Sequence, residues 1–106
     1  MIDVRAARER WYGFDSRLAA PPDMAELRAI YLDMMTAVGE LHGLVVDCGR
    51  HHPAAVGVNE AFEEFQGGIR KVGLDMRLTS PGGFQMGLQA SVEAALRTLD
   101  RIDHDA

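Results

Sequence analysis

The sequence predicts an all-α protein in which four amphipathic helices form a single domain over residues 1–106. Apolar side chains recur at alternating steps of three and four residues in four consecutive stretches, which places them on one side of an α-helix. Proline or glycine separates these stretches, and no alternating apolar run bounded by turn residues predicts a strand. We therefore expect helices at about residues 2–19, 24–48, 54–79 and 84–102.

The first helix is predicted from an apolar stripe that charged side chains largely avoid. Pro21 and Pro22 follow it, and the residue before a proline is pushed out of helical geometry, so the helix should end before them. Gly13 lies inside this helix and weakens it by about 1 kcal/mol relative to alanine. The stripe consists of Val4, Ala7, Trp11, Phe14 and Leu18.

The second helix carries the longest stripe in the chain. Asp23 precedes it and Glu26 follows three residues later, an acidic variant of the capping box, while Gly49 is expected to end the helix. Gly39 and Gly43 lie off the stripe, where they are either tolerated weak points or a notch for a closely approaching backbone. The stripe consists of Met24, Leu27, Tyr31, Met34, Val38, Leu41, Val45 and Cys48.

The third and fourth helices are separated by the clearest break in the chain, residues 80–83, which read Ser-Pro-Gly-Gly. Pro53 suits the first position of the third helix, with a later start at Asn59 as the alternative because Gly57 interrupts. The third stripe consists of Ala55, Val58, Phe62, Phe65, Ile69, Val72, Met76 and Thr79. The fourth consists of Leu88, Val92, Ala95, Leu99 and Ile102.

Short connections between the helices favour antiparallel neighbours, as in an up-down-up-down bundle. The alternative is an antiparallel helical hairpin kinked at one level, because the breaks at Pro21-Pro22 and at Pro81 lie about equally far along the chain from the turn at 51–52. The compact bundle buries more apolar surface within one chain, whereas an open hairpin needs a second chain to cover its stripes.

Composition excludes several classes of protein. A net charge of −5 argues against a general nucleic-acid binder, which would carry a basic surface. One cysteine forms no internal disulfide framework, and no run approaches the roughly 18 apolar residues that would predict a membrane span. The charged start lacks the apolar core of a signal peptide, so we expect a cytoplasmic protein, with export by an unconventional route as the alternative.

Four residues of types that can bind a metal lie near the turn between the second and third helices. They are His42, Cys48, His51 and His52. They are weak candidates, because no second cysteine accompanies Cys48 and Cys48 also completes an apolar stripe. We predict no metal and no other cofactor. No nucleophile motif or phosphate-binding glycine loop occurs, so the sequence predicts no enzyme.

Large side chains on the first and third stripes are the candidates for binding a partner, since buried aromatic residues dominate interface energies. These candidates are Trp11, Phe14, Phe62, Phe65 and Ile69. The alternative is that all five are core residues of the chain itself.

The chain resembles the Trp-x-Gly (WXG) helical-hairpin proteins of type VII secretion and their looser actinobacterial relatives, and the pattern from Val58 to Asp103 is similar to the second half of such proteins. The resemblance covers about residues 24–102 and lies in two heptad-patterned helices that meet at a glycine-containing turn. The residues that carry it are Val58, Ala61, Phe62, Phe65, Ile69, Leu74, Leu88, Val92, Leu99 and Asp103. The chain departs from the family in having Trp11-Tyr12-Gly13 in its first helix and no tryptophan at the turn. The resemblance implies a dimerising hairpin that acts as a secreted partner or adaptor.

We therefore expect a non-enzymatic protein–protein interaction module that acts through apolar helix stripes, as a homodimer or the smaller member of a heteromeric complex. Two alternatives stay open. One is a small inhibitor or regulator of a host or phage enzyme, and the other is a metal-binding helical bundle. We expect no binding to nucleic acid or to membranes.

Overall fold

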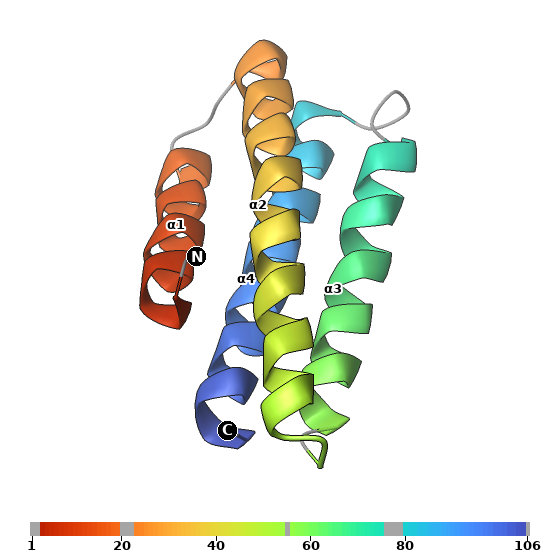
Figure 1. Ribbon diagram of the computed structural model, residues 1–106. Coiled ribbons are helices and arrows are strands. Elements are labelled where there is room, and N and C mark those ends of the chain that lie inside the picture. Colours follow the sequence, from red (N-terminus) through yellow and green to blue (C-terminus); the bar gives the residue numbers. More distant parts are fainter. Residues whose placement is uncertain (1–2, 20–22, 55, 76–79, 106) are drawn as a thin grey trace.

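The chain folds into a four-helix bundle whose helices run alternately up and down (Figure 1). The computed structural model describes residues 3–19, 23–54, 56–75 and 80–105, with side chains as far as Asp103. The helices are α1 (Val4–Ala19), α2 (Met24–His51), α3 (Val56–Asp75) and α4 (Pro81–Asp105), and no strand occurs in the described ranges. The prediction of an all-α bundle is confirmed, and the bundle rather than the open hairpin is the form this chain adopts.

Side-chain caps fix the start of three helices. Asp3 Oδ1 accepts a hydrogen bond from the Ala6 N–H at 2.8 Å, and Asp23 Oδ1 accepts one from the Glu26 N–H at the same distance. At α4, Ser80 Oγ accepts from the Gly83 N–H at 3.1 Å. Since proline at the first helical position loses no hydrogen bond, α4 begins at Pro81 and not at residue 84.

The expected end of α2 at Gly49 is wrong. The helix continues through Gly49 to His51, and no described residue has a positive φ. Glycine ends a helix by adopting the left-handed conformation, and Gly49 does not adopt it. His52 caps the end of the helix, because it precedes Pro53 and is therefore pushed out of helical geometry. The His52 N–H donates a hydrogen bond to the Cys48 carbonyl at 2.7 Å.

The third helix begins at Val56, later than the expected residue 54 and earlier than the alternative start at Asn59. It is described as far as Asp75, so the predicted continuation through 76–79 lies outside the described residues.

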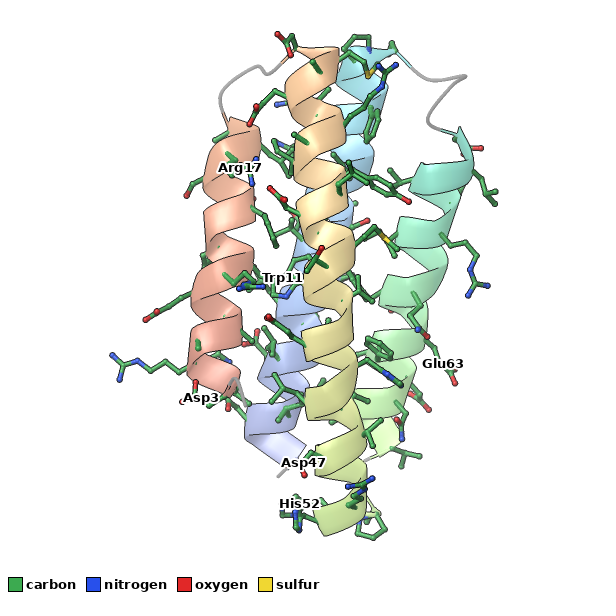
Figure 2. The ribbon with its side chains drawn as sticks, turned by 45° about the horizontal axis from the view of Figure 1, so that its top comes forward. Asp3, Trp11, Arg17, Asp47, His52 and Glu63 are labelled. Carbon is green, nitrogen blue, oxygen red and sulfur yellow. The ribbon has the colours of Figure 1, made fainter. Side chains whose placement is uncertain are left out.

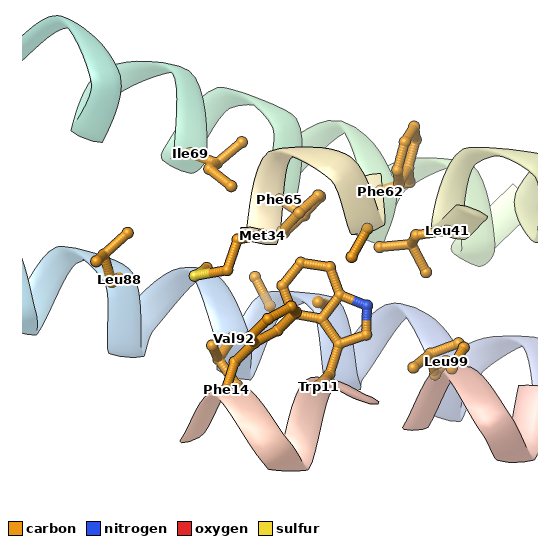
Figure 3. Packing of buried hydrophobic residues seen from close by; sticks show 14 of the residues in the cluster. Trp11, Phe14, Met34, Leu41, Phe62, Phe65, Ile69, Leu88, Val92 and Leu99 are labelled. Carbon is orange, nitrogen blue, oxygen red and sulfur yellow. The ribbon is translucent and has the colours of Figure 1, made fainter. Parts of the chain in front are cut away.

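The core runs the length of the bundle and contains side chains from every helix (Figure 3). The Trp11 indole is 1% exposed and lies edge-to-face against Phe14 at 5.1 Å and against Phe65 at 5.4 Å between ring centroids. No Cα atom of α1 comes within 8 Å of one in α3, so the Trp11–Phe65 ring contact bridges two helices whose backbones stay apart.

The buried face of α2 is turned slightly from the predicted stripe. Ile30 and Ala37 are fully buried, whereas Tyr31 and Val38 are half-buried at the side of the helix next to α3. A strict 3.5-residue repeat drifts around a helix of 3.6 residues per turn, so over 28 residues the stripe cannot stay centred on the core. Because α2 contacts α1, α3 and α4, its buried face is wider than one seam.

Alanine substitutions at two helical glycines, Gly67 and Gly87, should have different effects on stability. We expect Gly67→Ala to raise the free energy of unfolding by about 0.5–1 kcal/mol, because an added Cβ meets no atom within 4 Å and alanine favours the helix. At Gly87 the added Cβ would lie 2.9 Å from Val72 Cγ2, and a valine side chain adjusts poorly, so α3 and α4 would have to separate. Thermal unfolding followed by circular dichroism should show a higher Tm for Gly67→Ala only; equal gains would contradict the close α3–α4 packing.

Candidate interaction surface

The five predicted partner-binding side chains belong to the core. Their exposed fractions are at most 6%, the value for Phe14, and Phe65 is fully buried. A partner that binds the folded bundle therefore does not reach them, and the alternative that all are core residues describes this structure. The five are Trp11, Phe14, Phe62, Phe65 and Ile69.

The weak metal candidates are not gathered into a site. Cys48 is buried, His42 stacks on the Phe62 ring at 5.5 Å, and His51 Nε2 lies 3.6 Å from Asp47 Oδ1. His52 is exposed at the end of α2 (Figure 2). Within the described part of the chain, no three His, Cys, Asp or Glu side chains lie close enough to hold a metal ion.

Three arginines of α1, namely Arg8, Arg10 and Arg17, join this helix to its own bundle. Arg10 Nη1 bonds Glu40 Oε1 at 2.8 Å, and Arg17, on the side of α1 that faces α2 (Figure 2), bonds Asp33 Oδ2 at 2.8 Å. Arg17 also reaches Glu26 at 3.3 Å. The hydrogen bond to Asp33 is the main cause that raises the pKa of the Arg17 guanidinium above its ordinary value. Arginine is protonated in any case, so this shift gives no pH switch.

A second set of ion pairs joins α1 to α4. Arg8 bonds Asp103 and, at 3.1 Å, Asp100; the Asp103 hydrogen bond is the largest cause that raises the Arg8 pKa. The carbonyl of Leu18, near the end of α1, accepts hydrogen bonds from Gln85 Nε2 at 2.5 Å and Gln89 Nε2 at 3.4 Å. Both sets of contacts hold α1 on the molecule's own core, where Trp11 is buried.

Within residues 29–46, these pairings leave no charged side chain on the outward side of α2. Between Ala29 and Val46 the sequence contains only two charged residues, Asp33 and Glu40, and both bond arginines of α1. The opposite side presents apolar or small residues for more than four helical turns. We call this the α2 outer face and define it by Leu32, Met35, Gly39, Gly43 and Val46.

The α2 outer face contains three of the exposed large apolar side chains. Leu32 is 64% exposed, Met35 43% and Val46 41%. A Cβ added at Gly39 or Gly43 would meet no atom within 4 Å, so none of the segments that the structure describes fills the notch that the glycines form. Exposed apolar residues are ordinary when scattered singly, but aligned along one helix they indicate a binding surface.

A cleft between α2 and α3 continues this apolar surface. It encloses about 310 Å³, and the phenol of Tyr31 approaches the Cα of Gly73 so closely that a larger residue there would clash with it. Leu74, 75% exposed, stands at the rim opposite Met35. The lining residues are Tyr31, Met35, Val38, Gln66, Ile69, Arg70, Gly73 and Leu74.

A larger cavity of about 400 Å³ lies between α3 and α4. Glycine and alanine form much of its wall, including Gly68, Gly87 and Ala90, and charges of both signs stand around it. Glu64 and Arg97 on its rim already pair with each other at 3.7 Å. None of the large apolar side chains that the structure shows as exposed lines this cavity, whereas Met35 and Leu74 line the α2–α3 cleft. The charges around the α3–α4 cavity are also more evenly balanced.

By length and composition alone, α2 could cross a membrane, contrary to the expectation from apolar run length. Only 28% of its most apolar 18-residue window is buried in the bundle. A core helix of a water-soluble protein meets the same criterion, so this property is weak support for a membrane role. The small buried share of this window means that much of the apolar surface of α2 faces outward.

The apolar stripes of the sequence do not indicate the α2 outer face, because the stripe of α2 packs mainly in the core. The signal was present in where the charges lie: the two acids of the 29–46 segment fall on one flank of the helix. Comparisons of the chain with protein-family models, with curated proteins and with solved structures find no match in any of the three.

Proposed function

We propose that this bundle is a non-enzymatic protein–protein interaction module that receives a partner helix on the α2 outer face and in the adjoining α2–α3 cleft. The observation that carries the proposal is the uncharged α2 outer face: the two acids within residues 29–46 bond α1, and Asp47, which follows Val46, lies beside His51. A cleft between two antiparallel helices runs lengthwise and suits an amphipathic helix that inserts apolar side chains at helical spacing.

The size of the surface favours a docked helix over a dimer formed through α2 alone. Residues 29–46 span about 26 Å at 1.5 Å per residue, and a helix is about 10 Å wide. The resulting footprint of about 260 Å² is well below the roughly 800 Å² per partner of a stable interface. Including the cleft and Leu74 enlarges the surface, and a partner helix lying between α2 and α3 uses both.

The proposal retains the role expected from sequence and changes the residues that perform it. The aromatic side chains hold the bundle together, and exposed aliphatic side chains of α2 and α3 do the binding. An adaptor of this kind agrees with what the resemblance to the Trp-x-Gly hairpin proteins implies. Membership of that family and export without a conventional signal peptide stay predictions.

Site-specific photo-crosslinking in the native host tests the proposal. We expect a benzoylphenylalanine placed at Met35 or Val46 to give a discrete covalent adduct, since both side chains stand on the proposed surface. The same residue at Tyr12, which is 54% exposed on α1, is the matched control and should give none. An adduct of twice the chain mass identifies a second copy as partner. Absence of adducts from positions 35 and 46, or equal adducts from position 12, refutes the proposal.

A further inference from the structure

We infer that the partner helix is acidic: the α2–α3 cleft selects an amphipathic helix whose apolar ridge is bordered by carboxylates. This inference rests on the proposed function and specifies the chemistry of the partner. It comes from two exposed arginines, Arg70 in the lining of the cleft and Arg28 one helical turn before Tyr31, neither of which pairs with an acid among the residues that the structure describes.

Arg28 begins the row of α2 side chains that faces the cleft. Residues 28, 31, 35 and 38 follow one another at steps of three, four and three, and the last three of them line the cleft. Arg28 is exposed and forms no ion pair with any residue that the structure describes. A carboxylate on a helix lying over Met35 would come within its reach.

Arg70 stands on the opposite wall. It lines the cleft one turn before Leu74, is exposed, and like Arg28 has no ion-pair partner in the described part of the chain. The guanidinium group is suited to bind a carboxylate through two parallel hydrogen bonds.

The acids of these two helices are directed elsewhere. Glu26 and Asp33 bond Arg17 on the α1 side of α2, and Asp75 lines the cavity between α3 and α4. Glu63 points outward from α3 (Figure 2) and lies seven residues from Arg70, about 10 Å along the helix. In a chain of net charge −5, the end of the cleft near Arg28 and Arg70 is therefore locally basic.

A membrane surface is the rival occupant of an apolar face with two cations. Stable binding to anionic lipid needs a cluster of several basic residues, and here there are two in a chain whose overall charge is negative. One arginine on the α3 wall of a groove and one on α2 just before the groove fit the two flanks of one helix better than a planar surface.

The test uses the full chain and two fluorescein-labelled helical peptides of 18 residues, followed by fluorescence anisotropy. Both peptides carry the same leucine ridge at helical spacing; one has glutamate on both flanks and the other lysine. Each exposed ion pair changes affinity only a few-fold. The two arginines attract the glutamate peptide and repel the lysine peptide, so we expect about a tenfold higher affinity for the glutamate peptide at low salt. The preference should shrink as salt is added.

Variants separate the inference from the proposed function. Arg28→Glu/Arg70→Glu should invert the preference. Lys71→Glu/Arg101→Glu makes the same change in net charge, with Lys71 on the α3–α4 cavity, and should leave it unchanged. A preference that survives the first double variant, equal affinity for both peptides, or inversion by the second double variant overturns the inference.

Leu32→Asp/Met35→Asp should abolish binding of both peptides while the circular dichroism spectrum stays helical. Binding that resists this change, or no binding of either peptide, counts against the proposed function itself. Vesicles of phosphatidylglycerol and phosphatidylcholine form the last arm. Vesicle binding that needs Leu32 and Met35, with no peptide binding, overturns the acidic helix in favour of a membrane surface.

Discussion

Replacement of Phe65 by aspartate is expected to unfold the bundle. The Phe65 ring is fully buried and contacts Trp11 at 5.4 Å and Phe62 at 5.9 Å between ring centroids. The change removes a large aromatic side chain, which alone lowers the free energy of unfolding by about 3–5 kcal/mol. It also places a carboxyl group among apolar side chains. Since domains of this size are stable by about 5–15 kcal/mol, little or no folded protein should remain.

Circular dichroism and light scattering together measure this outcome. The Phe65→Asp variant should lose its cooperative thermal transition, whereas the control Phe65→Leu keeps an apolar side chain and should lose only about 1–2 kcal/mol. A Phe65→Asp protein that stays helical and has half the mass of the parent would place Phe65 at an interface between chains. That result would contradict the burial described above.

Replacement of Trp11 by alanine is the second change with a large expected effect, about 3–5 kcal/mol of lost stability. The indole is 1% exposed and is the largest buried side chain of α1, which has only 16 residues. Its edge-to-face contacts with Phe14 and Phe65 add to the apolar area it buries.

Urea titration of the variant against Tyr12→Ala measures the effect. Tyr12 is the adjacent aromatic residue, 54% exposed, so its loss should change stability by less than about 0.5 kcal/mol. Similar midpoints for the two variants would mean that α1 contributes little to the core. A large loss from Tyr12→Ala would mean that the outer side of α1 is covered by something other than solvent.

The fold was predictable because its signals are local. Four apolar stripes, the Asp23 cap and the break at residues 80–83 each lie within a few residues of the helix they define. Helix ends were harder to predict, since Gly49 is compatible both with continuing a helix and with ending one. The backbone conformation decides between them, and it depends on Pro53 as much as on the glycine.

The proposed interaction surface was not predictable from apolarity alone. A stripe that packs on its own core and a stripe that packs on a partner have the same composition, so Phe62 and Phe65 satisfied both interpretations. Only the tertiary contacts separate them. Those contacts also assign Asp33 and Glu40 to α1, and this pairing is what leaves the α2 outer face neutral.

The meeting of the Trp11 and Phe65 rings has a consequence for cooperativity. Because α1 and α3 touch through these rings while their backbones stay beyond 8 Å, either helix that detached would remove an aromatic ring against which the other packs. The protein should therefore melt in a single step and not shed its first helix early. In native-state hydrogen exchange, the central amides of α1 would then be protected about as strongly as those of the longer helices.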